Sequence, residues 1–433
     1  MRAFSASDIR LLTARDVVRR VQSGGLSAEA VCRAHIERSL AVEADIQAWQ
    51  CFAPQHALAQ ARQPDTGGAL AGVVLGVKDM IDTADLPTCY GSEAYQGFRP
   101  PWDAPVVTLA RHQGAVVLGK TACTEFSLTS PAKTRNPSNK AHTPGGSSSG
   151  SCAAVAAGMV HAAFGTQTSG SIIRPASFCG VVGYKPSFGM LNRSGVKPLS
   201  DSLDTVGVVG RNVRDVAMIA AVLAERPELM PGRQADAPRF GLFFGSRRDF
   251  MQPETERALR RATAAAAATG VPPSALDPPE WFDALHACHD AVMGWETTRA
   301  LAYERMHRTG MVNEVTLLFL DRLSRVTLED YDAAQQALMD RAGLLDQLLG
   351  DCDVLLTAAA PGEAPRGLDS TGDPVFNKVW TLLHGPCVTL PAGHGPLGLP
   401  VGVQLVGRLG GDAGVLAAAA LLEDALASLP REI

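Results

Sequence analysis

Two loops rich in glycine and serine constrain the fold of this chain more than any other feature. They span residues 144–151 (PGGSSSGS) and 165–175 (GTQTSGSIIRP), and residues 152–164 between them are mostly small and apolar. Glycine allows backbone conformations that are closed to other residues, and the small apolar residues 152–158 favour a closely packed helix over a solvated tether. The pattern therefore predicts two tight loops held against a buried helix.

The two loops suit acyl transfer better than phosphate binding. A phosphate-binding loop of the common type ends in Gly-Lys-Ser or Gly-Lys-Thr, and neither loop contains that sequence. A loop with few side chains can direct several backbone N–H groups at one point, as the oxyanion hole of an acyl-transfer enzyme requires. Serines of these two loops are then the candidate active-site hydroxyls.

A single lysine, Lys78, lies in an apolar run upstream of both loops. Residues 73–81 (VVLGVKDMI) have the pattern of a buried strand. Burial disfavours the charged form of lysine and lowers its pKa, and a neutral amine can take the proton of a serine hydroxyl. The alternative is an ordinary lysine at a strand end, with Asp79 solvated beside it.

Three further segments, together with the lysine and the two loops, resemble the amidase signature family. Residues 178–187 (FCGVVGYKPS), 202–207 (SLDTVG) and 398–407 (GLPVGVQLVG) are similar to the family's motifs, in the same order along the chain. The resemblance implies an α/β fold, with one large amidase domain over residues 1–433 and a central mixed β-sheet covered by helices on both sides.

The domain is expected to have three parts. These are a signature core at about 69–212, a helix-rich insertion at about 213–350, and C-terminal strands with a helix at about 351–433. The insertion is expected to help shape the substrate pocket. Trp295, Tyr303 and Trp380 are candidates for the pocket wall, although a plain core position is the favoured interpretation of each.

The resemblance also assigns roles to individual residues. Ser171 corresponds to the nucleophile, Ser147 to the bridging serine that follows a cis peptide bond after Gly146, and Lys78 to the terminal base. The oxyanion hole corresponds to the backbone N–H groups of Thr168, Ser169, Gly170 and Ser171. Neither a metal nor a cofactor is implied.

The second loop departs from the family pattern at three positions that bear on the substrate. Gln167 replaces the usual aspartate, Ser169 replaces a glycine, and Arg174 lies one position later than the usual arginine. The late arginine resembles the malonamidase branch, whose substrates are small amides with a free carboxylate. Arg174, which can hold a carboxylate through two parallel hydrogen bonds, and Gln167 are therefore the expected substrate-binding residues. The alternative for Arg174 is a structural ion pair.

The function expected is hydrolysis of a small, carboxylate-bearing amide through a serine acyl-enzyme. A carboxylated urea or biuret-type amide is the alternative substrate. A glutaminase-type subunit of a tRNA amidotransferase is a further alternative, although Gln167 and Ile173 stand where that subunit has aspartate and arginine. A non-catalytic scaffold is disfavoured because Lys78, Ser147 and Ser171 are all present.

Composition narrows the partners and the compartment. The net charge of −5 gives no electrostatic basis for nucleic-acid binding, and no apolar run reaches the length of a membrane span. The nine cysteines contain no Cys-x-x-Cys pair, which favours reduced thiols over disulfides or a metal site. Residues 1–8 lack the apolar core of a signal peptide. A cytoplasmic enzyme with a small-molecule amide substrate is expected, and a homodimer is left open.

Overall fold

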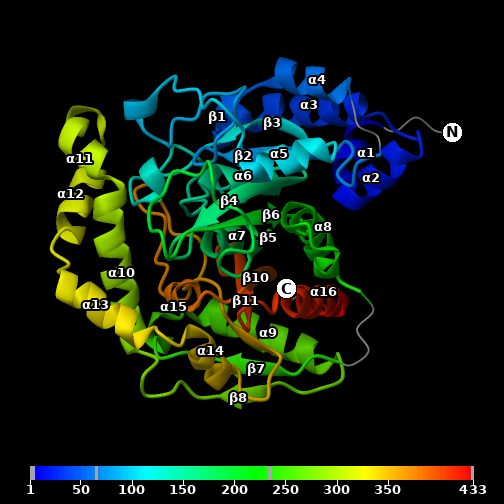
Figure 1. The fold of residues 1–433 in the computed structure, drawn as a ribbon. Helices are drawn as coiled ribbons and strands as arrows, with labels where there is room; N and C mark the ends of the chain where they lie inside the picture. The colour runs from blue at the N-terminus through cyan, green and yellow to red at the C-terminus, as the bar shows by residue number, and fades with distance from the viewer. Residues whose placement is uncertain (1–4, 64–66, 233–236, 431–433) are drawn as a thin grey trace.

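A mixed β-sheet of eleven strands forms the centre of the protein in the computed structural model, which describes residues 5–63, 67–232 and 237–430 (Figure 1). Part of the N-terminal segment in which no signal peptide was expected, residues 1–4, lies outside the described residues. The strands are β1 (Trp49–Phe52), β2 (Val74–Lys78), β3 (Val116–Thr121), β4 (Ala162–Gln167), β5 (Val182–Lys185), β6 (Thr205–Gly210), β7 (Phe240–Phe243), β8 (Ser274–Leu276), β9 (Val354–Ala358), β10 (Cys387–His394) and β11 (Pro400–Gly407).

The strand order is β1-β3-β2-β4-β6-β5-β10-β11-β9-β7-β8, so strands from both ends of the chain form one sheet. Strands β2, β3 and β4 are mutually parallel, as are β7, β8 and β9, and the remaining pairs are antiparallel. The helix-rich insertion expected at 213–350 therefore also supplies two strands, β7 and β8.

Helices cover both faces of this sheet. They are α1 (Ala6–Leu11), α2 (Ala14–Gln22), α3 (Ala28–Ile46), α4 (Pro54–Ala61), α5 (Pro105–His112), α6 (Ser149–Ala156), α7 (Ile173–Cys179), α8 (Val213–Ala224), α9 (Pro253–Ala267), α10 (Ala284–Ala300), α11 (Ala302–His307), α12 (Glu314–Leu323), α13 (Leu328–Ala337), α14 (Arg341–Leu349), α15 (Lys378–Leu382) and α16 (Asp412–Ser428). Helices α5, α8, α9 and α16 share one apolar cluster with the sheet, and α3, α6 and α7 share the other. The expected α/β domain with a central mixed sheet is confirmed.

The alternation of side chains along β2 decides where Lys78 points. Val74 packs in the cluster beneath α6, whereas Leu75 and Val77 pack in the cluster on the opposite face of the sheet. Because successive side chains of a strand point to opposite faces, Lys78 faces the same side as Val74. That side carries α6, whose N-terminal end follows the first serine-rich loop.

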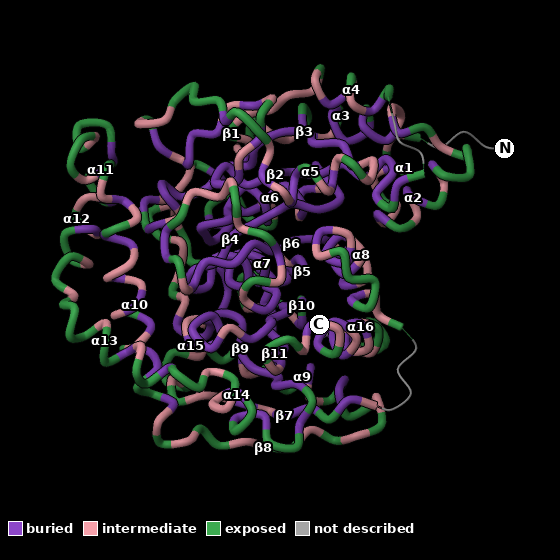
Figure 2. Tube along the Cα trace, in the orientation of Figure 1, coloured by how far each residue is buried: buried purple, intermediate pink, exposed green. Residues whose placement is uncertain are grey.

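A group of helices stands beside the sheet and extends away from it. We call α10, α11, α12 and α13 the helical arm; α12 and α13 pack on α10, and α10 packs on α15 of the core (Figure 1). The outer helices of the arm are largely exposed, whereas the strands and the loops around α6 and α7 are buried (Figure 2). No helix among the described residues is long and apolar enough to cross a bilayer.

Candidate active site

Lys78 is completely buried at the end of β2, where its amine contacts two hydroxyl groups. Its Nζ lies 2.7 Å from Ser147 Oγ, 2.6 Å from Thr166 Oγ1 and 3.4 Å from the Thr166 carbonyl oxygen. Thr166 is adjacent because β4 runs parallel to β2, with Val77 paired to Phe164. Burial lowers the pKa of Lys78 to about 8. A substantial fraction of the amine is then neutral near physiological pH, as a general base requires.

Ser147 is held in a tight turn that leads into α6. The peptide bond between Gly146 and Ser147 is cis, as the family resemblance implied. Gly145 adopts a φ of +81°, and a Cβ at this position would come within 2.8 Å of the Pro175 Cα atom. The glycines of this loop therefore allow the two serine-bearing loops to approach closely.

Ser171 lies beside this turn and opens onto a cavity. The N–H of Ser148 donates to the Ser171 carbonyl oxygen at 3.2 Å, which ties the two loops together. Within the described part of the chain the Ser171 hydroxyl makes no hydrogen bond. Ser171 lines the cavity, whereas Ser147 is covered. A nucleophile must reach substrate, and of these two serines Ser171 is the one that faces the cavity.

The loop before Ser171 presents unpaired backbone donors. Among the described residues, the N–H groups of Thr168, Ser169, Gly170 and Ser171 make no backbone hydrogen bond. Asn377 packs so closely that a Cβ on Gly170 would lie 2.4 Å from its Oδ1 atom, so only glycine fits there. The four donors are those expected for an oxyanion hole, and that assignment stays a prediction.

Both ends of the Gln167 side chain are bound within the protein. Its Oε1 accepts from the N–H groups of Ile172 and Ile173 at 2.8 and 3.0 Å, and its Nε2 donates to Thr381 Oγ1 at 3.0 Å. The side chain is completely buried and does not line the cavity. Gln167 therefore fixes the start of α7 behind Ser171, and direct contact with substrate stays an untested prediction.

Arg174 lines the cavity, but most of its guanidinium is already engaged. Its Nε donates to the Thr371 carbonyl at 2.8 Å, and its Nη2 donates to the Gly146 carbonyl at 2.7 Å and to Thr371 Oγ1 at 3.2 Å. Only Nη1 has no partner among the described residues. Burial lowers the pKa of Arg174 to about 10, with Asp373 acting in the opposite direction. To hold a carboxylate through two hydrogen bonds, as expected, Arg174 would have to give up one of these internal bonds.

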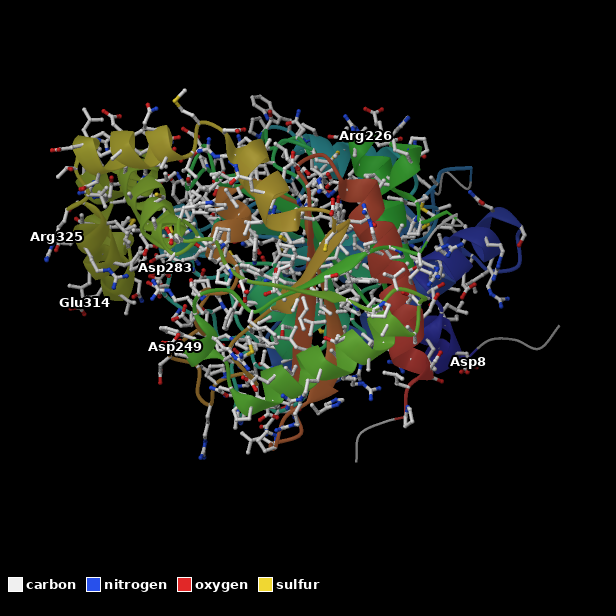
Figure 3. The ribbon with its side chains drawn as sticks, turned by 90° about the horizontal axis from the view of Figure 1, so that it is seen from below. Asp8, Arg226, Asp249, Asp283, Glu314 and Arg325 are labelled. Carbon is white, nitrogen blue, oxygen red and sulfur yellow. The ribbon has the colours of Figure 1, made fainter. Side chains whose placement is uncertain are left out.

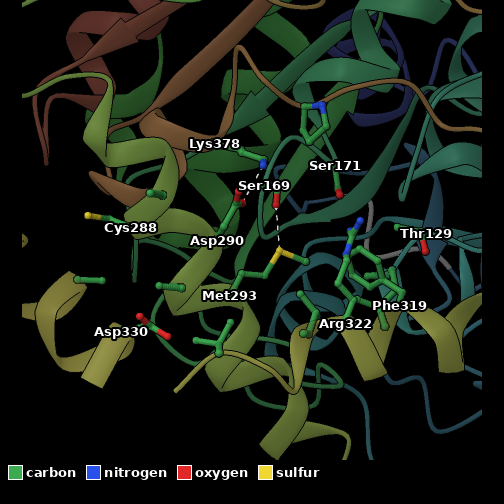
Figure 4. Close-up of a pocket in the computed structure, with 18 of the residues that line it drawn as sticks. Thr129, Ser169, Ser171, Cys288, Asp290, Met293, Phe319, Arg322, Asp330 and Lys378 are labelled. Atoms are coloured by element: carbon green, nitrogen blue, oxygen red, sulfur yellow. Dashed lines mark hydrogen bonds and ion pairs between the residues drawn. The ribbon is translucent and has the colours of Figure 1, made fainter. Parts of the chain in front are cut away.

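A histidine of the arm contacts the loop that precedes Ser171. His289 Nε2 lies 3.1 Å from Ser169 Oγ and 3.2 Å from the Thr168 carbonyl oxygen, and its Nδ1 lies 3.2 Å from Asp290 Oδ1. Lys378 donates to the same Asp290 oxygen at 2.7 Å (Figure 4). Burial raises the pKa of Asp290, but the contacts with His289 and Lys378 outweigh it and hold that pKa at about 2.

The cavity in front of Ser171 has a volume of about 860 Å³ and lies between the core and the arm (Figure 4). The core side contributes residues 127–129, Ser169, Ser171 and Arg174 of the second loop, and residues of the segment that leads into α15. The arm side contributes residues of α10, α12 and α13, so the insertion does shape the pocket. None of the three candidate aromatic residues lines this cavity. Trp380 packs against Phe243 in the core, as the favoured interpretation expected, whereas Trp295 stacks on Tyr331 and Tyr303 is half exposed.

Sequence reasoning missed Thr166 and His289. Thr166 lies in the second glycine- and serine-rich loop, directly before Gln167, so its position was a usable signal. His289 is 120 residues from Ser169, and nothing in its local sequence points to that contact. Within the described ranges no three metal-ligating side chains gather at one point.

Comparison with known proteins gives a consistent result over nearly the whole chain. The family model described as "Amidase" matches residues 30–416. A glutamyl-tRNA(Gln) amidotransferase subunit from Chloroflexus aggregans is 33% identical, with 93% of this chain and 94% of the relative covered. The corresponding protein of Geobacter sp. (strain M21) is 30% identical, with 94% and 96% covered.

Solved structures agree with the sequence relatives. A 6-aminohexanoate cyclic dimer hydrolase, complexed with substrate, superposes with a TM-score of 0.85 at 26% identity and covers 97% of this chain and 98% of its own. A chain from a vestigial protein complex, described as revealing the origins of an s-triazine catabolic enzyme, superposes with a TM-score of 0.88 at 25% identity and covers 97% and 99%.

Proposed function

Since this chain belongs to the amidase signature family and is a hydrolase of carbon–nitrogen amide bonds, we propose that Ser171 is its nucleophile, Ser147 its proton relay and Lys78 its base. The observation that carries this proposal is the buried contact of 2.7 Å between Lys78 Nζ and Ser147 Oγ. A neutral amine at this position has a lone pair to accept the serine proton.

The reaction then proceeds in two balanced halves. Lys78 accepts the proton of Ser147 while Ser147 takes that of Ser171, and the Ser171 oxygen bonds to the substrate carbonyl carbon. The carbonyl oxygen becomes an oxyanion stabilised by the N–H groups of the preceding loop. The proton returns through Ser147 to the leaving nitrogen, the C–N bond breaks, and ammonia or an amine departs. Water, deprotonated by the same relay, releases the carboxylic acid and regenerates Ser171.

The proposed substrate is a small amide that also carries a carboxylate, as in the malonamidase branch. Arg174 supports it, because its guanidinium stays charged at neutral pH and its Nη1 has no partner among the described residues. Arg174 therefore offers the substrate one guanidinium nitrogen, not the two nitrogens that a bidentate contact with a carboxylate uses. A carboxylated urea or biuret-type amide presents the same two groups and is the alternative within this class.

A second candidate is the glutaminase-type subunit of a tRNA amidotransferase. The relatives from Chloroflexus and Geobacter, which belong to such an enzyme, favour it. Gln167 and Ile173 stand against it, because they replace the aspartate and the early arginine of that subunit. The two candidates differ in assembly: the first is proposed to work alone or as a homodimer, whereas the second would work together with other chains.

Active-site labelling with a fluorophosphonate, followed by peptide mass spectrometry, tests the nucleophile. Labelling on Ser171 and its loss in Ser171→Ala are expected, together with ammonia release from carboxylated amides by the purified chain alone. Labelling at another serine would exclude Ser171. Ammonia release from glutamine only in the presence of added amidotransferase subunits would favour the second candidate.

A further inference from the structure

Three positively charged side chains line the cavity, and they differ in how far the protein already uses them. Lys378 is paired with Asp290 at 2.7 Å. Arg174 is bound through Nε and Nη2 to Gly146 and Thr371. The side chain of the third, Arg322, makes no ion pair or hydrogen bond with any residue that the structure describes. It alone offers a whole guanidinium fork to a ligand.

The Arg322 side chain nevertheless has a defined position, because it packs on a neighbouring aromatic ring. It lies in the last turn of α12, three residues after Phe319, and residues three apart on a helix share a face. Its guanidinium carbon is 4.7 Å from the centre of the Phe319 ring. Both side chains line the same cavity as Ser171, and Phe319 packs against the core cluster that contains Leu128 (Figure 4). An arginine stacked on a ring keeps its N–H groups free for an anion.

The cavity lining that includes Arg322 is largely apolar, and Leu128, Met293, Leu323 and Val326 contribute to it. Arg322 itself is exposed, so its guanidinium is accessible to a ligand that enters the cavity.

The two acidic residues on the arm wall, Asp290 and Asp330, have other partners. Asp290 pairs with Lys378. Asp330 already accepts hydrogen bonds from the Thr327 N–H and hydroxyl as the N-terminal capping box of α13. Arg322 and Asp330 therefore act as separate groups in the cavity wall.

Size also argues against a very short substrate. The cavity of about 860 Å³ lies in the range of sites for drug-sized ligands, about 300–1,000 Å³. A three-carbon molecule such as malonamate would leave most of it empty. Ser171 approaches from the core side and Arg322 from the arm side, so a chain spanning the cavity would reach both.

We propose that Arg322 recognises the carboxylate of a substrate whose scissile carboxamide lies at the other end of an apolar chain. This rests on the proposed function of Ser171 and names its substrate class: a monoamide of a dicarboxylic acid longer than malonate, or an equivalent with an apolar spacer. Arg174 then supports the loop near the amide, and Arg322 selects the anionic end.

The test compares malonamate, succinamate, glutaramate and adipamate with the neutral amides of the same chain length. Wild type is expected to prefer the longer monoamides to their neutral counterparts. Arg322→Ala should lower kcat/KM for those monoamides by roughly tenfold to a few hundredfold, which is the range for loss of a hydrogen bond to a charged group. Most of this change should be a rise in KM. Neutral amides should be unaffected, and Arg322→Lys should recover part of the loss.

Arg325→Ala is the matched control, because Arg325 lies one turn further on, pairs with Asp321 and points away from the protein (Figure 3). It should change neither substrate series, and thermal unfolding of all variants should match wild type. Hydrolysis that depends on Ser171 but is unaffected by Arg322→Ala, or greatest with malonamate, would overturn the role of Arg322 and leave the proposed nucleophile intact. Absence of Ser171-dependent hydrolysis of any amide would overturn both.

Discussion

Arg174 donates a hydrogen bond from Nη2 to the carbonyl oxygen of Gly146, 2.7 Å away. Gly146 forms the cis peptide bond to Ser147, so an arginine that was expected to bind substrate also supports the turn that carries the proposed proton relay. The same guanidinium holds Thr371 on the other side. Its removal must therefore affect the catalytic loop as well as any anionic substrate.

We accordingly expect Arg174→Ala to lower kcat for neutral and carboxylated amides alike. Loss of charge-assisted hydrogen bonds of about 1.5–3 kcal/mol each corresponds to a fall in rate of roughly tenfold or more. Steady-state kinetics with matched neutral and carboxylated amides measure it, with Arg322→Ala as the comparison. A loss confined to carboxylated amides would instead identify Arg174 as the substrate fork and contradict its supporting role.

Substitutions of Ser171 and Ser147 should lower activity to different extents. Ser171→Ala should lower kcat by on the order of 10³-fold or more, since no acyl-enzyme can form. Ser147→Ala should be severely impaired but retain measurable activity if a water bridges the relay. Ser149→Ala, which removes only a hydrogen bond to the Gly145 carbonyl, is the control in the same loop and should stay close to wild type. Equal activity of Ser171→Ala and the control would remove Ser171 from the mechanism.

The pH dependence follows from the burial of Lys78. Its pKa of about 8 lies below the ordinary lysine value, and the neutral form of Lys78 is the proposed base. Activity should therefore fall about tenfold per pH unit below that pKa and level off above it. A kcat/KM profile across this range measures the effect. Lys78→Met should lie far below wild type at every pH, and a wild-type profile that falls on raising the pH through 8 would contradict a lysine base.

The sequence was most informative where chemistry and local pattern coincide. Lys78 stands in a run whose apolar residues predict a buried strand, and the strand is buried throughout. The central mixed sheet followed from the resemblance to the amidase signature family. Local pattern also predicted the small-residue helix α6 between the two loops.

Contacts between distant segments were not predictable in the same way. Whether Arg174 faces a ligand or a carbonyl depends on Thr371, nearly 200 residues further along the chain. The partner of Ser169 comes from α10 in the arm. Strand β8 is three residues long, and its residues show no strong alternation of buried and exposed side chains. Its pairing with β7, and not its own sequence, defines it as a strand.

A substitution at Gln167 tests whether this side chain stabilises the loop or contacts the substrate. Gln167→Ala would leave the N–H groups of Ile172 and Ile173 without their acceptor, and a buried group left unpaired costs about 1–3 kcal/mol. We expect a lower free energy of unfolding in denaturant titrations. The ratio of activities on carboxylated and neutral amides should not change. Unaltered stability with a changed ratio would support the original prediction that Gln167 contacts substrate.

The last prediction concerns Ser169, which stands where most of the family has glycine. Its hydroxyl lies 3.1 Å from His289 Nε2 and 3.4 Å from Met293 Sδ, so it ties the candidate oxyanion loop to α10. Ser169→Gly removes that tie and adds backbone freedom next to Gly170, which should lower kcat several-fold while KM changes little. His289→Ala should produce a similar fall, because it removes the other half of the same contact. The double variant should then lose little more than either single variant, since the two residues act as a unit. Fully additive losses would mean that Ser169 and His289 act independently, and the arm would then have no demonstrated role in positioning the loop.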